Sequence, residues 1–257
     1  MEQIRNKVGF ICDMDGVIYH GNQILPGVAE FVNWMIDNDK RFVFLTNSAE
    51  RTPHELSMKL SRMGLNVSAD HFYTSAMATA EFLHSQRPGC TAYVIGEAAL
   101  SKALYDLGIY MNDVNPDYVV VGETRSYSFE KLEKAINLVR KGAKLIGSNP
   151  DTTGPVENGI IPATGALIAP IEIATGKKAY FVGKPNPLML RHGLKKINCH
   201  SSEIVFVGDR MDTDIIAGIE SNVDTVLVLS GVTKMEDIDR FPYRPKYIAS
   251  GVGELIL

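Results

Sequence analysis

Apolar residues recur along the chain in two patterns that alternate from one end to the other. Short, nearly continuous runs of Val, Ile and Phe predict buried β-strands, because a strand that is covered on both faces has no polar side. The runs predicted as strands are Val8–Cys12, Arg41–Leu45, Ala92–Ile95, Tyr118–Val121, Lys144–Ile146, Tyr180–Val182, Ile204–Val207 and Thr225–Leu229.

The segments between these runs have the spacing of amphipathic helices. Apolar residues three or four positions apart form two helical stripes: Val28, Phe31, Val32, Met35 and Ile36 in one, and Phe129, Leu132, Ile136 and Val139 in the other. Thr52, Pro53 and Glu55 form a capping box with proline at the first helical position, so we expect a helix to begin there. The alternation of strands and helices predicts an α/β protein with a parallel sheet.

Composition does not mark a domain boundary, since the chain contains neither a low-complexity tract nor a long linker. The middle third, roughly residues 88–178, nevertheless has strands and helices of its own and can bury a small core. The residues that suggest chemistry lie outside it, toward both chain ends. This distribution indicates one domain that is interrupted by another.

Charge and cysteine usage exclude several classes of function. Lys and Arg number 26 against 30 Asp and Glu, and this formal charge of −4 argues against a nucleic-acid or anionic-membrane surface. Charged residues interrupt every apolar run before it reaches the ~18 residues of a membrane span, and the first run meets Asp13 too early for a signal peptide. Cys12, Cys90 and Cys199 are far apart, so we expect no disulfide or zinc site and a cytoplasmic location.

The first predicted strand ends in two aspartates, Asp13 and Asp15, which Gly16 follows. Ligands of open α/β sheets bind at the carboxyl ends of the strands. Two carboxylates there can hold Mg²⁺, and one can attack phosphorus as a nucleophile. Asp-x-Asp-Gly is also a common composition of surface turns, but the apolar residues before it favour the functional interpretation.

Two further strand ends carry groups that suit a phosphate. Thr46, Asn47 and Ser48 follow the second strand, and their hydroxyl, amide and backbone N–H groups can bind phosphate oxygens, although the same residues also describe an ordinary loop. Lys184 lies between a glycine and a proline after a later strand. Most lysines are solvated surface charges, but a restrained lysine can neutralise the charge that develops in phosphoryl transfer.

The strand over residues 204–207 leads into Gly208 and Asp209, with Asp212 and Asp214 close behind. Asp209 can complete a magnesium site begun by Asp13, and Asp214 can orient Asp209. Asp212 or Thr213 can equally cap a following helix. Together the strand ends supply an acid pair, a hydroxyl, a lysine and a further acid, which are the parts of a metal-assisted phosphoryl transfer. The absence of GxGxxG, Walker A, GxSxG and HExxH patterns disfavours other common enzyme classes.

The order of these residues resembles the four motifs of the haloacid dehalogenase superfamily of Mg²⁺-dependent phosphatases: DxD, Thr or Ser, Lys, and a late acidic loop. Within it, nearly the full chain resembles the NagD-type branch. The segments that carry the resemblance are Tyr73–Ala80, Val121–Tyr127, Gly147–Asp151, Pro162, Thr164–Ala166, Thr175–Gly176 and Val182–Pro185. It implies a Rossmann-like core of residues 1–80 and 179–257, and an inserted α/β cap of the C2 type, residues 81–178, that closes over the leaving group.

The resemblance also assigns roles to single residues. Asp13 would be the nucleophile that forms an aspartyl-phosphate, and Asp15 would protonate the leaving oxygen and later deprotonate a water molecule. The residues that would hold Mg²⁺ are Asp13, Asp15 through its main-chain carbonyl, and Asp209. The residues that would bind the substrate are Thr46, Asn47 and Lys184 at the phosphoryl group and Arg210, Met211, Asp212 and Thr213 in the loop that closes the site.

The implied substrate is a small phosphomonoester, with nucleoside 5′-monophosphates such as uridine monophosphate first. Sugar phosphates, phosphoglycolate and pyridoxal phosphate are alternatives, because Arg210 stands where the NagD-type branch commonly has Asn and where phosphatases for the last two have Arg. A phosphomutase and a non-catalytic binding module are alternatives of other classes.

The sequence indicates less about which residues of the inserted segment contact the leaving group. Polar candidates are Glu123, Arg125, Asn149, Asp151, Glu157 and Asn158, each of which can equally be a solvated loop residue. Related proteins often dimerise through the cap, so a homodimer of that kind is a further expectation.

Overall fold

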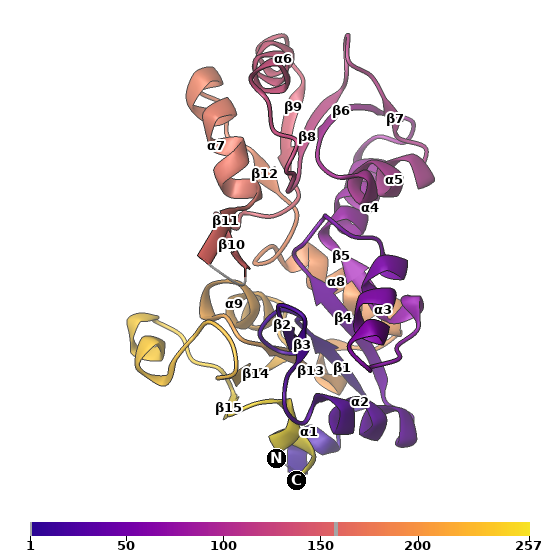
Figure 1. The fold of residues 1–257 in the computed structure, drawn as a ribbon, viewed down its shortest axis with the longest axis vertical. Helices are drawn as coiled ribbons and strands as arrows, with labels where there is room; N and C mark the ends of the chain where they lie inside the picture. Colours follow the sequence, from indigo (N-terminus) through magenta and orange to yellow (C-terminus); the bar gives the residue numbers. More distant parts are fainter. Residues whose placement is uncertain (1, 157–158) are drawn as a thin grey trace. The chain divides into compact units, whose positions relative to one another are not determined.

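Apolar strands from both ends of the chain pair in one sheet. The computed structural model describes residues 2–156 and 159–257. Among these residues, six strands form a sheet in the order β15-β14-β13-β1-β4-β5, in which β1 runs parallel to β13 on one side and to β4 on the other (Figure 1). The strands are β1 (Gly9–Cys12), β4 (Arg41–Thr46), β5 (Phe72–Thr74), β13 (Ile204–Gly208), β14 (Asp224–Val228) and β15 (Tyr247–Ala249).

Helices cover both faces of this sheet because successive side chains of each strand point to opposite sides. Phe10 and Phe44 lie on the face that packs against α2 (Val28–Asp37) and α3 (Pro53–Arg62). On the other face, Ile11 and Val43 approach Gly193 of α8 (Pro187–Ile197), and Phe206 approaches α9 (Ile216–Glu220). The same part of the chain also contains α1 (Glu2–Arg5) and a hairpin of β2 (Tyr19–His20) and β3 (Gln23–Ile24).

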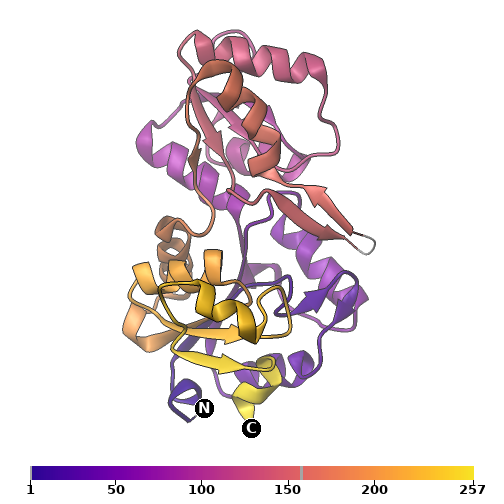
Figure 2. The same ribbon diagram turned by 90° about the vertical axis from the view of Figure 1, so that its left-hand side faces the viewer.

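The middle of the chain builds a second sheet, with the strand order β12-β9-β8-β6-β7. Its strands are β6 (Thr91–Ile95), β7 (Tyr110–Met111), β8 (Tyr118–Val121), β9 (Lys144–Gly147) and β12 (Tyr180–Phe181). Figure 1 shows α4 (Ser75–Gln86) and α5 (Ala98–Asp106) on one side of it, and α6 (Phe129–Arg140) and α7 (Thr164–Thr175) on the other. A hairpin of β10 (Thr153–Val156) and β11 (Gly159–Pro162) precedes α7, as Figure 2 also shows.

The chain divides into two units. The first contains residues up to Thr46, Pro53–Tyr73 and Lys184–Leu257, and the second contains Asn47–Thr52 and Thr74–Gly183. The second unit is therefore an α/β domain inserted into the first. Its boundaries differ from those expected after residues 80 and 178: residue 80 lies inside α4, and a continuous helix belongs to one unit. The short segment Asn47–Thr52 also belongs to the second unit, which no sequence pattern predicts.

All eight predicted strands are present, with ends that differ from the prediction by at most one residue, and α3 begins at Pro53 as its capping box predicts. The predicted helical stripes are wrong at single positions. Ile36 is 52% exposed and Phe129 is 75% exposed, because each lies at the edge of its helix's buried face. In the described part of the chain, no helix combines the length and the hydrophobicity that a membrane crossing requires.

Candidate active site

The acidic residues of the first unit lie at one edge of its sheet. Asp13 directly follows β1 and Asp209 directly follows β13, and these two strands are parallel neighbours in register. Thr46 is the last residue of β4, the parallel neighbour of β1 on its other side. Parallel pairing thus places the carboxyl ends of three strands together, where open α/β sheets bind ligands.

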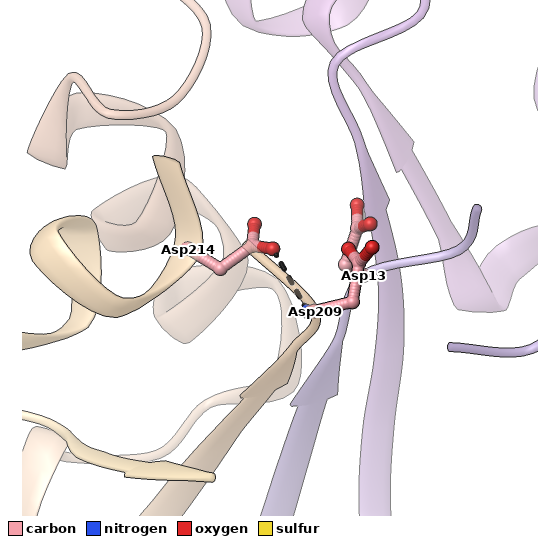
Figure 3. A group of neighbouring side chains, drawn as sticks. All are labelled: Asp13, Asp209 and Asp214. Carbon is pink, nitrogen blue, oxygen red and sulfur yellow. Dashed lines mark hydrogen bonds between the residues drawn. The ribbon is translucent and has the colours of Figure 1, made fainter. Parts of the chain in front are cut away.

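Asp214 joins Asp13 and Asp209 to form a group of three carboxylates. Carboxylate oxygens of the three residues lie within 4.8 Å of one another, and all three side chains are buried. Figure 3 shows Asp214 reaching toward the other two from the far side of the β13 end, with one of its oxygens accepting a hydrogen bond from the Asp209 backbone N–H at 3.2 Å. A second bond to that oxygen comes from the Arg210 backbone N–H at 3.1 Å. Asp214 therefore holds the turn that presents Asp209.

Lys184 connects two of these carboxylates. Its Nζ donates to Asp13 Oδ1 at 2.5 Å and to Asp214 Oδ1 at 2.8 Å, and its side chain is only 3% exposed. Charge-assisted hydrogen bonds of this kind are stronger than neutral ones. They fix Lys184 directly beside Asp13, the proposed nucleophile.

One ammonium group cannot neutralise three carboxylates, and the pKa values reflect this imbalance. Burial raises the pKa of Asp13 well above its ordinary value, with the charges of Asp214 and Asp209 adding to the effect and Lys184 opposing it. Burial, followed by the charge of Asp214, raises the pKa of Asp209 to about 7. The pKa of Lys184 is raised because Asp13 and Asp214 outweigh the opposing effect of burial. The group as a whole favours the approach of additional positive charge.

The surroundings of Asp209 fit a small divalent cation. Asp209 Oδ2 accepts a hydrogen bond from the Val232 backbone N–H at 2.7 Å, whereas its Oδ1 is buried and has no hydrogen-bond partner among the described residues. A Cβ atom at Gly16 would come within 2.5 Å of Asp209 Oδ2, and one at Gly231 would also collide with this carboxylate. Oxygen ligands and excess negative charge are what Mg²⁺ requires, so these residues fit that ion.

Asp15 lies apart from the carboxylate group but close to it in the chain. Its Oδ2 accepts a hydrogen bond from the Tyr19 hydroxyl at 3.0 Å, and the side chain is partly exposed. Tyr19 begins the β2–β3 hairpin, so this hairpin holds the Asp15 carboxylate. A carboxyl group that is hydrogen-bonded yet reachable by solvent suits proton transfer better than permanent charge pairing.

The predicted substrate-binding loop, Arg210–Thr213, divides into two kinds of residue. Arg210 pairs with Asp212 at 2.8 Å, and both side chains are partly exposed. Met211, in contrast, is buried in an apolar cluster with Ile215, Leu227 and Ile238. Residues Met211–Ile215 form a π-helical turn before α9, so neither Asp212 nor Thr213 is the N-cap residue of that helix.

The predicted phosphoryl-binding pair is split between the units. Thr46 is buried at the end of β4 in the first unit, whereas Asn47, the next residue, belongs to the second. Among the predicted leaving-group contacts, Glu123, Asn149 and Asp151 hydrogen-bond to the segment that starts at Asn47. Arg125 is exposed, while Glu157 and Asn158 lie outside the described residues.

Sequence reasoning missed the contribution of the loop after β14. Ser230 Oγ donates to the Gly16 carbonyl at 2.7 Å, and Val232 N–H holds Asp209. The available signal was one more strand end, that of β14, which the small residues Ser230 and Gly231 follow. Asp214 was expected to orient Asp209, but its contact with Lys184 has no sequence signal because the two residues are 30 positions apart.

A doubly covered α/β sheet with acids and a hydroxyl at the carboxyl ends of its strands, and with a lysine bound to two of the acids, defines a hydrolase or transferase that can act on phosphate groups. Comparison with known families makes this specific. The family model of haloacid dehalogenase-like hydrolases matches residues 10–110, and a second model of the same group matches residues 181–255. Together with the relatives below, these matches show that the chain belongs to the haloacid dehalogenase-like hydrolases.

The similar proteins are phosphatases with different named substrates. The chain is 45% identical to dihydroxyacetone phosphatase of Corynebacterium glutamicum over 97% of this chain and 90% of the relative. It is 47% identical to ribonucleotide monophosphatase NagD of Escherichia coli over 95% and 96%, respectively. The solved structure of that NagD superposes with a TM-score of 0.92 over 97% of this chain and 98% of its own, at 46% identity.

A third relative has been solved with a metal ion. Glycerol phosphate phosphatase of Mycobacterium tuberculosis in complex with magnesium superposes with a TM-score of 0.92, at 28% identity, over 97% of this chain and 76% of its own. The chain is thus a phosphoric monoester hydrolase with a Rossmann-like core and an inserted α/β cap domain.

Proposed function

We propose that this enzyme is a Mg²⁺-dependent phosphatase that hydrolyses small phosphomonoesters through an aspartyl-phosphate, with nucleoside 5′-monophosphates such as uridine monophosphate as its first candidate substrates. The observation that carries the proposal is the buried group of Asp13, Asp209 and Asp214 with Lys184 bound to Asp13 at 2.5 Å. It combines a nucleophile, a fixed cation and uncompensated negative charge in one place.

In the proposed first step, Asp13 attacks the phosphorus atom. A bond forms between a carboxylate oxygen and phosphorus while the ester bond breaks, and Asp15 gives its proton to the departing oxygen. Lys184, held between Asp13 and Asp214, binds phosphoryl oxygens together with Thr46 and Asn47 and stabilises their charge. The alcohol leaves, and the phosphoryl group is on Asp13.

In the second step, Asp15 takes a proton from water, whose oxygen attacks the phosphorus of the aspartyl-phosphate. The bond to Asp13 breaks, inorganic phosphate leaves, and both aspartates return to their starting state. We propose that the substrate lies at the end of β13, in contact with Arg210, Asp212, Thr213 and the backbone of Met211. Thr213 is buried, whereas Arg210 and Asp212 are paired with each other, which holds this loop in one conformation.

Asp13, the main-chain carbonyl of Asp15 and Asp209 are the proposed Mg²⁺ ligands, and Asp214 lies within reach of the same point. When bound, the ion supplies the positive charge that compensates the carboxylates and the transferring phosphoryl group. The carboxylate oxygens, the partnerless Asp209 Oδ1 and the raised pKa of Asp209 support this assignment.

The substrate is the open part of the proposal. Similarity to ribonucleotide monophosphatase NagD supports nucleotides, whereas comparable similarity to dihydroxyacetone phosphatase supports a small sugar phosphate as the second candidate. Phosphoglycolate and pyridoxal phosphate remain alternatives through Arg210, which stands next to Asp209. The test is phosphate release from a panel of all these esters, first with Mg²⁺ and then with EDTA, with Asp13→Asn as the control.

Release that requires Mg²⁺ and is strongest with one ester supports the proposal and identifies the leaving group. Transfer of phosphate to a second substrate hydroxyl instead of water would indicate a phosphomutase, and metal binding without turnover would indicate a binding module. Either result contradicts the proposed hydrolysis.

The proposals of a cytoplasmic location and of a homodimer rest on features outside the candidate active site. Cys12, Cys90 and Cys199 are free thiols, two of them buried, which supports a reducing cytoplasm. The α5–β7 region exposes Tyr105, Tyr110, Met111 and Val114, which supports a homodimer through the inserted domain. Light scattering across a concentration series, compared with a Tyr110→Asp variant, tests the dimer.

A further inference from the structure

The segment Asn47–Thr52 is attached by hydrogen bonds to distant parts of the second unit. Asn47 Nδ2 donates to Asp151 Oδ2 at 2.9 Å, and the Asn47 carbonyl accepts from Asn149 Nδ2 at 2.7 Å and from Ser75 Oγ. Asn149 and Ser75 are completely buried. The side chain and the main chain of Asn47 are therefore both held from outside its own segment.

Glu123 holds the same segment two residues further along, at Ala49. Its Oε2 accepts the Ala49 backbone N–H at 3.1 Å, and its Oε1 accepts Asn149 Nδ2 at 2.5 Å. Asn149 Nδ2 consequently donates both to Glu123 and to the Asn47 carbonyl. Gly183 leaves room for this arrangement, since a Cβ there would come within 2.8 Å of Asn149 and of Asn47 Oδ1.

We propose that Glu123, Asn149 and Asp151 are positioning residues that fix Asn47 for phosphoryl binding. They act on the reaction through Asn47 and not by touching the leaving group, and the inference rests on the proposed function because that function gives Asn47 its role. We call these three residues the Asn47 clamp.

The chemistry of the clamp matches this task. An amide nitrogen carries two protons, and a carboxylate only accepts hydrogen bonds. Donation of one proton to Asp151 therefore sets the orientation of the Asn47 amide, including the direction of its second proton. The bonds to the Asn47 carbonyl and to Ala49 N–H set the backbone on both sides of the turn.

The burial of the Glu123 carboxyl group is unfavourable, and this also supports a positioning role. Burial raises the pKa of Glu123 to about 7, although the hydrogen bonds from Asn149 and Ala49 oppose that effect. Thr46 ends β4 of the first unit, and Asn47 is bonded to it through one peptide link. Fixing Asn47 within the second unit thus makes a phosphoryl-binding group depend on residues more than 70 positions away in the sequence.

The deciding experiment is a double-mutant cycle on Asp151→Ala and Asn47→Ala. Competitive inhibition by inorganic phosphate is measured together with KM and kcat for the best ester. We expect Asp151→Ala to raise the phosphate inhibition constant and KM about 10-fold, with a smaller change in kcat, because a lost orienting hydrogen bond weakens binding by roughly that factor. In the Asn47→Ala background, the same substitution should have little further effect.

Two variants serve as controls. Asp151→Asn retains a carboxamide oxygen that can accept from Asn47 Nδ2, so we expect it to restore most of the phosphate affinity. Glu97→Gln alters a carboxylate of the same unit that accepts two hydrogen bonds, from Thr124 Oγ1 at 2.9 Å and Arg125 N–H at 3.1 Å, and that forms no hydrogen bond with Asn47–Thr52 in the described part of the chain. It should leave the phosphate inhibition constant near the parent value.

Additive effects of Asp151→Ala and Asn47→Ala, or an equal effect of Glu97→Gln, would overturn the clamp as a positioning device while the parent enzyme remained active. A different result would contradict the proposed function: the parent enzyme would release no phosphate from any ester in the presence of Mg²⁺. The two failures are thus separated by the activity of the unsubstituted protein.

Discussion

The buried polar groups of the first unit differ in charge from those of the second. In the first unit, Asp13, Asp209, Asp214 and Lys184 are each less than 10% exposed and carry formal charges that do not cancel. In the second unit, the completely buried polar side chains are neutral and are held by hydrogen bonds, as Ser148 is by Thr164 at 3.1 Å and Ser75 is by the Asn47 carbonyl. Uncompensated buried charge needs a ligand, whereas a closed network of neutral groups fixes geometry.

This difference between the two units predicts which property each kind of substitution should change. Changes among the charged residues should alter chemistry and metal binding, and changes in the neutral network should alter the placement of groups. Proteins can tolerate unbalanced buried charge because a bound ion or substrate supplies the missing partner, so these sites mark function more reliably than neutral networks do.

The largest expected effect is that of Asp13→Asn. The amide cannot form the aspartyl-phosphate, so we expect turnover to fall about 10⁴-fold or more, in the range found when a nucleophile is removed. Phosphate release in the presence of Mg²⁺ measures this effect, and circular dichroism verifies that the variant is folded. Turnover near that of the parent enzyme would exclude the covalent mechanism.

Asp15→Asn should have the next largest effect. Asn cannot donate a proton to the leaving oxygen, and loss of a general acid costs roughly 10²–10⁴-fold in rate. The loss should be smaller for an ester such as 4-nitrophenyl phosphate, whose leaving group needs no proton. Equal losses for good and poor leaving groups would contradict the role of Asp15 as the acid.

The free energy of unfolding of Lys184→Met tests how much the buried ion pairs stabilise the first unit. Removal of the ammonium leaves Asp13 and Asp214 without their partner, and breaking a buried ion pair in this way costs about 3–5 kcal/mol. Trp34, the single tryptophan, lies in α2, so its fluorescence during urea unfolding with EDTA reports on the first unit.

Lys178→Met is the matched control for the second unit. Lys178 pairs with Glu172 at 3.2 Å, but its side chain is 87% exposed, and such surface pairs contribute roughly 0–1 kcal/mol. A similar loss of stability in both lysine variants would remove the distinction between the two kinds of charge.

The smallest expected effect is the pH dependence contributed by Glu123. The folded protein keeps a proton on Glu123 up to about pH 7 because burial raises its pKa, whereas the unfolded chain releases that proton near its ordinary pKa of 4.5. Raising the pH from about 4.5 to about 7 should therefore lower the free energy of unfolding of the second unit by about 2–3 kcal/mol more in the parent than in Glu123→Gln.

Hydrogen exchange at the buried amides of Val119–Val121 in β8, corrected for intrinsic rates, measures this difference. A difference between parent and variant that does not change across this pH range would show that Glu123 is ionised in the folded protein.

Strands and strand-end residues could be predicted from the sequence because their signals are local. A run such as Ile204–Val207 can be buried only as a strand or a short helix segment, and Asp209 follows it directly. The Asn47 clamp could not be predicted, since Glu123 and Asp151 reach the Asn47 segment across 74 and 104 positions. Their sequence context suggested leaving-group contacts, and only tertiary pairing shows what their side chains bind.

Local patterns alone were not sufficient for the loop after β13. Asp212 and Thr213 have the composition of a helix cap, but the chain forms a π-helical turn that carries Asp214 toward Lys184 instead. Met211 lies in the predicted substrate loop, and the apolar residues of the C-terminal region bury its side chain, so the proposed contact with substrate is through its backbone. In both cases, contacts made later in the chain outweigh the local preference.

The pairing of β1 with β13 has a consequence for the order of events during synthesis. A ribosome adds about 200 residues between Asp13 and Asp209, which at ~5–20 residues per second takes roughly 10–40 s. During that interval, β1 has no β13 beside it, while residues of the second sheet emerge as one uninterrupted stretch. The nascent chain therefore holds Asp13, the proposed nucleophile, before Lys184, Asp209 and Asp214 exist, and the proposed site is complete only with the last quarter of the polypeptide.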